Sequence, residues 1–179
     1  MSTRVPKHRA LLVPCLLVAL AFCLFWPLVF GRAHLVPFHI LAEDPALEGL
    51  DTAATRPDWR TYDLAPLTMF YAEKSLVAAG LRRGELPLWN PYNGLGTPLL
   101  ADGQSQPLAP FFLPFLAFPN PWMYSLCLVV QLLFGGLGMD RFLKALGVSP
   151  LARSVGAALF AFSPFALKYM AFSNVWAAV

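Results

Sequence analysis

Residues 10–30 read ALLVPCLLVALAFCLFWPLVF and contain no charged side chain. A helix needs about 20 consecutive apolar residues to cross the roughly 30 Å hydrocarbon core of a bilayer. Arg4, Lys7 and Arg9 precede this stretch, with no acidic residue among them. A cleaved signal peptide would have an apolar core of about 7–15 residues followed by a small-residue cleavage site, and this stretch shows neither. We therefore predict an uncleaved first transmembrane helix over residues 10–30, with residues 1–9 in the cytoplasm by the positive-inside rule.

The composition of the chain agrees with a membrane location. Its 179 residues are 58% hydrophobic and 13% charged, whereas soluble proteins average about 25% charged residues. We therefore expect an all-α, multispanning membrane protein. The basic residues flank apolar stretches and do not alternate with exposed aromatic residues, so no nucleic acid partner is expected. Cys15, Cys23 and Cys127 lack the paired spacing of a zinc site or a disulfide framework and are expected to be small buried apolar residues.

Further apolar segments follow in the second half of the chain. No charged residue occurs from Gly103 to Met139, which is too long for a single span, and prolines punctuate its first half. We expect a re-entrant or interfacial segment over residues 108–118, a second span over 122–142 and a third over 151–170. The glycines of residues 135–138 provide a small-residue face suited to close helix packing.

The charges beside the predicted spans define one topology. The basic residues at the N-terminus, Arg141 and Lys144 after the second span, and Arg153 at the start of the third all fall on the cytoplasmic side. Trp122 and Tyr124 are expected to anchor the outer end of the second span in the interfacial aromatic belt. Residues 171–179 would begin the next external segment. Because the chain stops within an apolar pattern, we expect it to be part of a longer protein.

Residues 31–107 form a long polar insertion between the first two spans. All but one of the ten acidic residues of the chain lie in it, and the topology places it outside the cytoplasm. Its residues 64–81 have the period of an amphipathic helix. The apolar face of this helix, with Leu67, Phe70 and Leu81, would lie on the membrane surface or dock on other helices. Residues 84–107, rich in Pro, Gly and Asn, predict a rigid folded loop with neither a helix nor a regular strand.

Several polar residues of this insertion could serve structure or chemistry. Asp63 suits an N-cap of the predicted helix. Glu85 could pair with the neighbouring Arg82 and Arg83, and Asp102 could form an Asx-turn. We find no His/Cys metal cluster, no phosphate-binding glycine loop and no nucleophile triad in the sequence.

A further candidate residue lies in the third predicted span. Lys168 would reach the outer interface, where it could snorkel to water or bind an anionic headgroup.

The order of motifs resembles the bacterial YfhO-like membrane proteins, which belong to the GT-C superfamily of multispanning glycosyltransferases. The likeness covers roughly residues 62–174. Its most specific part is the run Gly84-Glu85-Leu86-Pro87-Leu88-Trp89-Asn90-Pro91-Tyr92, which is followed by Gly94-Leu95-Gly96-Thr97-Pro98. The resemblance implies a GT-C-like helical bundle in a bacterial plasma membrane, with a large first extracytoplasmic loop. It also implies transfer of a sugar from a polyprenyl-phosphate donor to a cell-envelope or other extracytoplasmic acceptor.

The resemblance also implies roles for particular residues. Asp63 corresponds to the acidic residue of the first external loop, which would act as a general base or as a metal ligand. Asp102 or Glu85 would supply a second carboxylate, and Trp89 and Tyr92 would stack on the sugar or the isoprenoid. No organic cofactor is required. A divalent cation, Mg²⁺ or Mn²⁺, would be held by Asp63 and Asp102, although the absence of an Asp-x-Asp motif leaves metal dependence open.

The alternative is a non-enzymatic membrane protein, either a transporter or an assembly partner for envelope polysaccharide. A transporter would carry ionisable residues inside several spans, each of which costs about 2.5–3.5 kcal/mol at mid-membrane. The predicted spans contain almost none. This pattern favours a site in the external loop.

Overall fold

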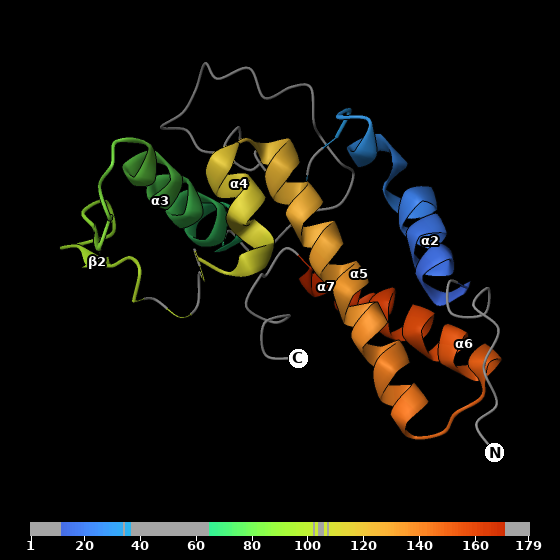
Figure 1. Cartoon of the computed structure of the whole chain (residues 1–179). Coiled ribbons are helices and arrows are strands. Elements are labelled where there is room, and N and C mark those ends of the chain that lie inside the picture. Colours follow the sequence, from blue (N-terminus) through green and yellow to red (C-terminus); the bar gives the residue numbers. More distant parts are fainter. Residues whose placement is uncertain are drawn as a thin grey trace.

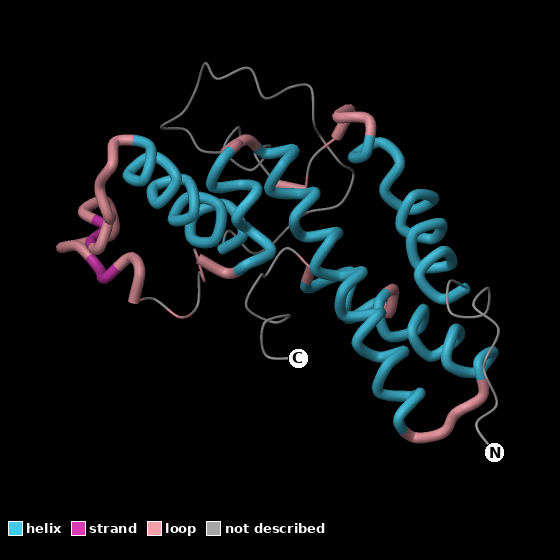
Figure 2. The backbone as a smooth tube through the Cα atoms, in the orientation of Figure 1, coloured by secondary structure: helices cyan, strands magenta, loops and turns pink. Residues whose placement is uncertain are grey.

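The computed structural model describes residues 12–33, 35–36, 65–101, 103, 106 and 108–170. The described part of the chain is mostly helical and includes one very short antiparallel strand pair (Figures 1 and 2). The elements are α2 (Leu12–Val29), the π-helix η4 (Pro66–Tyr71), α3 (Ala72–Arg82), β1 (Trp89–Asn90), β2 (Thr97–Pro98), the 3₁₀-helix η5 (Pro110–Phe112), α4 (Leu113–Ala117), α5 (Pro121–Ala145), α6 (Pro150–Ala161) and α7 (Pro164–Tyr169).

Three helical segments are long and apolar enough to cross a membrane: Leu12–Val29, Pro121–Ala145 and Pro150–Tyr169. The prediction of a helical protein with membrane-spanning segments is thereby confirmed at this level. The third segment, expected as one helix, is instead broken into α6 and α7. Pro164 supplies no backbone N–H to continue the helix, and the extended Ser163 caps α7 by accepting a hydrogen bond from the Ala166 N–H at 3.1 Å.

The first span is bent near its end. Phe25 departs from helical geometry (φ −115°, ψ 21°), two residues before Pro27. The proline removes a hydrogen bond and its ring crowds the carbonyl one turn earlier. Beyond the bend, the Trp122 indole donates a 2.6 Å hydrogen bond to the Leu28 carbonyl. This bond joins the C-terminal end of α2 to the N-terminal end of α5, so the two spans are antiparallel (Figure 1).

The three spans approach one another closely at Gly136 of α5. A Cβ there would lie 3.0 Å from both the Ala161 Cβ and the Leu17 Cδ1. The small-residue face expected for α5 thus lets α2 and α6 pack closely against α5 at Gly136. Val13, Leu17, Ala157 and Ala161 form the buried cluster around this point.

The predicted amphipathic helix is present as η4 continued by α3. It ends in a Schellman motif: Gly84 has a φ of +75°, its N–H bonds to the Leu81 carbonyl at 3.0 Å, and the Glu85 N–H bonds to the Gly80 carbonyl at 3.1 Å. Leu67 and Phe70 are buried as expected, whereas Leu81 is exposed.

The following loop is folded, and it contains a strand pair that was not predicted. Trp89 pairs with Pro98 and Asn90 with Thr97. Turn geometry makes this possible, because Gly94 and Gly96 both adopt positive φ.

The larger core joins the insertion to the spans. Helix α3 packs on α4, and α4 packs along the N-terminal half of α5 (Figure 1). Tyr124, expected in the interfacial aromatic belt, is instead buried at the centre of this core. Its ring contacts the aromatic residues of η4, η5 and α4, which a bare transmembrane helix would not provide. The buried members of the core are Ala21, Leu28, Val36, Leu67, Val77, Ala78, Leu99, Phe112, Phe115, Leu116, Tyr124, Cys127, Leu128, Val129 and Met170.

The cysteines differ from one another. Cys127 is buried as expected, but Cys15 and Cys23 are exposed on α2. A membrane-spanning helix turns apolar side chains outward toward lipid, so burial inside the protein is not required of them.

Candidate functional site

Two of the predicted site residues, Asp63 and Asp102, lie outside the described residues. The prediction that they act as base and second carboxylate, or that they hold a metal ion, therefore stays a prediction. Within the described ranges, no group of three or more His, Cys, Asp or Glu side chains is arranged to hold a metal ion.

Glu85 lies on the surface directly after the end of α3. Its carboxylate accepts a hydrogen bond from Arg83 Nε at 3.1 Å, and both side chains are more than 60% exposed (63% for Arg83 and 64% for Glu85). Pairing with a neighbouring arginine is the structural role that the sequence suggested. A pair this exposed contributes at most about 1 kcal/mol.

Trp89 and Tyr92 belong to the strand pair and its turn. The Trp89 indole lies over Gly96, where any Cβ would overlap the ring. The Tyr92 N–H donates to the Asn90 side-chain oxygen at 3.0 Å, which fixes the turn. Both aromatic side chains are exposed, so they are available to a ligand while their backbone is held in place.

Lys168 lies on α7, and its Nζ is 5.3 Å from the centre of the Tyr169 ring. Helix α7 is the last part of the third membrane-length segment, whereas Figure 1 shows the strand pair at the far end of α3. The structure therefore brings Glu85, Trp89 and Tyr92 into one loop but leaves Lys168 in a different part of the molecule.

A buried lysine, whose burial the sequence did not predict, lies in the core of the insertion. Lys74 of α3 is 0% exposed. Its Nζ lies 4.3 Å from the ring centre of Phe112, 5.8 Å from that of Phe70 and 5.9 Å from that of Tyr124. The rings offer their electron-rich faces to a cation, an interaction worth about 2 kcal/mol when water is excluded. The adjacent Glu73 is also buried, at 5% exposed.

The aromatic cluster around Lys74 is centred on Tyr124. The Tyr124 ring lies 5.3 Å from Tyr71, 5.4 Å from Phe112 and 5.6 Å from Phe115. Its hydroxyl is buried and has no hydrogen-bond partner among the described residues. Burial raises the pKa of the neighbouring Tyr71 phenol, and a hydrogen bond from Ser75 lowers it in part. We call Lys74 and its aromatic residues Phe70, Phe112 and Tyr124 the lysine cage.

The sequence carried a signal for the lysine cage. Lys74 follows Phe70 by four residues and precedes Val77 and Ala78 by three and four, so it shares their helical face. Lysines on such a stripe commonly extend their amine to water. Full burial requires Phe112 and Tyr124, which come from distant parts of the chain. A fully buried lysine among aromatic rings marks a candidate functional site or a structural centre.

An apolar groove runs along the face of α5. Its volume is about 640 Å³, and its size and lining suit a hydrocarbon chain better than a polar solute. The residues that line it come from η5 and its flank, α5 and α6: Ala109, Pro110, Phe111, Gln131, Phe134, Gly135, Gly138, Met139, Phe142 and Phe160.

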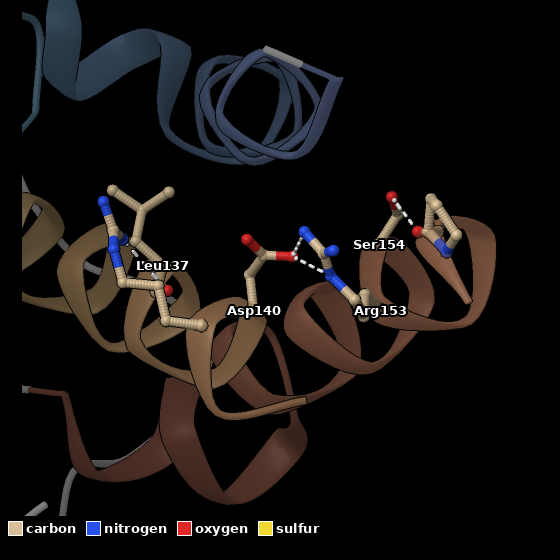
Figure 3. Close-up of polar contacts among 6 residues, drawn as sticks. Leu137, Asp140, Arg153 and Ser154 are labelled. Atoms are coloured by element: carbon tan, nitrogen blue, oxygen red, sulfur yellow. Dashed lines mark hydrogen bonds and ion pairs between the residues drawn. The ribbon is translucent and has the colours of Figure 1, made fainter. Parts of the chain in front are cut away.

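A partly buried ion pair lies at the other end of the bundle. Arg153 Nε and Nη2 each lie 2.8 Å from Asp140 Oδ1, and the two side chains are only 15% and 14% exposed. Figure 3 shows the carboxylate of α5 facing the guanidinium of α6. The ion pair ties the end of α5 to the start of α6, next to the turn that reverses the chain.

Comparison of the chain with protein-family models, curated proteins and solved structures found no match. The fold itself defines the class: a helical protein with three segments that can span a membrane and, among the described residues between the first two, a folded segment over residues 65–101.

Proposed function

We propose that the protein is a multispanning membrane glycosyltransferase of the GT-C type. It would transfer a sugar from a polyprenyl-phosphate donor to a cell-envelope or other extracytoplasmic acceptor. The observation that supports the proposal is the folded segment formed by the described residues of 65–117, between α2 and α5. It packs on the N-terminal half of α5, shares a core with Leu28 at the C-terminal end of α2, and displays the Gly84–Pro98 run on which the resemblance rests. A lipid-linked donor and a polar acceptor meet at such a boundary.

Asp63 is the proposed general base toward the acceptor hydroxyl. It lies two residues before Ala65, where the described helix begins, and that helix is anchored by the buried side chains of Leu67 and Phe70. Anchoring of the helix supports the role, because a base must be held in position to be effective. Asp102 would supply a second carboxylate and, with Asp63, the ligands of a divalent cation such as Mg²⁺ or Mn²⁺ if one is used.

The donor would be recognised through both its lipid and its polar parts. The apolar groove along α5 supports the proposal, because it offers an isoprenoid chain about 640 Å³ at the depth of the spans. Trp89 and Tyr92 would stack on the sugar or the isoprenoid of a donor held at the bilayer interface. Glu85 would contact the sugar from the same loop, and Lys168 would bind an anionic headgroup elsewhere on the outer face. The N-terminus would lie in the cytoplasm and the insertion outside the plasma membrane of a bacterium.

Replacement of Asp63 by asparagine tests this function in cells. We expect envelope glycosylation to fall by about 100-fold or more, since a positioned base contributes roughly 10²–10⁴-fold to rate. The measurement is the sugar content of the isolated cell envelope, with protein abundance in the membrane quantified in the same cells. Asp58→Asn, the same change in the same insertion, is the matched control and should leave glycosylation unchanged.

Two outcomes would count against the proposal. Wild-type glycosylation by Asp63→Asn at normal abundance would remove Asp63 from the catalytic role. An unaltered envelope in cells that lack the protein altogether would contradict the transferase and favour the alternative of a non-enzymatic transporter.

A further inference from the structure

The loop after α3 turns a group of large apolar side chains outward. Their exposed fractions are 60% for Leu86, 62% for Leu88, 55% for Trp89, 80% for Tyr92 and 104% for Leu95. We call these five residues the hairpin tip. Monomeric soluble proteins rarely gather large apolar side chains in this way without something to cover them.

The backbone beneath the hairpin tip is firmly held. Asn90 and Leu99 are buried, and the Leu99 N–H donates to the Leu88 carbonyl at 2.8 Å. The Pro87 ring packs on Gly80 of α3, where a Cβ would lie 2.8 Å from it. The outward direction of the apolar side chains is therefore built into the fold and is not the result of a loose loop.

The hairpin tip lies to the side of the spans. Figure 2 shows the strand pair at the outer end of α3, away from α2, α5 and α6, and near the level of the α5 N-terminus. That terminus is one end of a membrane-length helix. The strand pair lies near the level of the α5 N-terminus and to the side of the spans. The surface of a bilayer around the spans would lie at the same place.

The chemistry of the hairpin tip matches a bilayer interface. Tryptophan and tyrosine prefer the headgroup level, and leucines beside them suit the adjoining acyl region. Arg82 and Arg83 precede the tip, and Glu85 pairs with Arg83 at 3.1 Å, so the formal charges of residues 82–85 sum to a positive value. A positive charge next to an apolar tip complements anionic lipid.

We infer that the hairpin tip inserts into the interface of the bilayer that the spans cross. The occupant of this surface is lipid, and the tip acts as a lateral anchor. Through the contact of Pro87 with Gly80 it holds the outer end of α3, and hence the lysine cage, at a fixed height above the membrane. The inference is independent of any catalytic activity.

Spin labels at the hairpin tip test the inference. The full chain with Cys15, Cys23 and Cys127 replaced by alanine would carry a nitroxide at Leu95→Cys and be reconstituted into vesicles of phosphatidylethanolamine and phosphatidylglycerol. Molecular oxygen concentrates in the acyl region, while a polar nickel chelate stays in water. We expect the ratio of oxygen to nickel collision rates to be about tenfold higher at Leu95 than at the control Glu85→Cys in the same loop.

Each alternative has its own signature. A ratio at Leu95 equal to that at Glu85, with rapid nickel collisions, would show a tip in water and overturn the inference. Slow collisions with both reagents would show a tip covered by protein and would also overturn it. Tyr92→Cys provides a second position: its side chain is exposed, so the change leaves the core intact, and it should give the same high ratio as Leu95.

Discussion

Lys74→Glu is expected to prevent the insertion from folding against the spans. The substitution places a carboxylate against the negative faces of Phe112, Phe70 and Tyr124, at a position that is 0% exposed and next to the buried Glu73. Loss of the cation–π contacts adds to the cost of an ionised group that water cannot reach. Together these effects exceed about 4 kcal/mol, the range reached by the most damaging single changes.

The measurement is the fraction of monodisperse protein remaining after heating in detergent, read by size-exclusion chromatography. Arg82→Glu makes the same charge reversal on the exposed end of the same helix and should leave the profile close to wild type. Lys74→Met keeps the apolar stem and removes only the charge, so it should fall between the two. Equal stability of Lys74→Glu and Arg82→Glu would contradict the burial of Lys74.

Arg153→Leu is expected to have the second largest effect on stability. It leaves the Asp140 carboxylate without its 2.8 Å partner at a position only 14% exposed. Removing one partner leaves the other charge unpaired in a partly buried site, which costs about 1–3 kcal/mol, more than the intact pair contributes. The expected result is a loosened contact between α5 and α6, with the packing of α6 against Gly136 lost as a consequence.

Pairwise substitution separates this effect from a general loss of charge. Asp140→Asn combined with Arg153→Leu removes the stranded carboxylate and should recover most of the stability lost in Arg153→Leu. Arg141→Leu is the matched control, because Arg141 is exposed and its guanidinium only donates to the Leu137 carbonyl at 3.2 Å. Thermal unfolding in detergent is measured for the wild type, Asp140→Asn, Arg153→Leu, the double variant and the control. Losses in the double variant equal to the sum of the two single losses would refute the pairing.

The membrane-length helices could be predicted because their transfer to hydrocarbon depends on local composition. Residues 10–30 have no charge, and α2 was found within them as Leu12–Val29. The break between α6 and α7 was missed, although Pro164 and Ser163 were visible in the sequence. Apolar composition continues across the break, and hydropathy takes no account of a missing backbone donor.

The lysine cage could not be predicted from the sequence in the same way. Its lysine sits on a helical stripe that the sequence reveals, but its burial depends on Phe112 and Tyr124, which reach α3 only when η5 and α5 fold against it. The same long-range packing buries Tyr124, which was expected in the interfacial aromatic belt. For the loop, the pattern of Pro and Gly correctly indicated a rigid structure, whereas the pairing of Trp89 with Pro98 depends on turn geometry that composition does not specify.

Transfer of a sugar from a polyprenyl-phosphate donor is tested most directly by the release of polyprenyl phosphate. The purified protein in vesicles would be incubated with the lipid-linked sugars extracted from bacterial membranes and with isolated cell envelope as acceptor, and the freed lipid phosphate measured by mass spectrometry. We expect release that depends on the protein and is lost in Asp63→Asn. No release above protein-free vesicles, together with movement of a solute across the vesicle membrane, would contradict it.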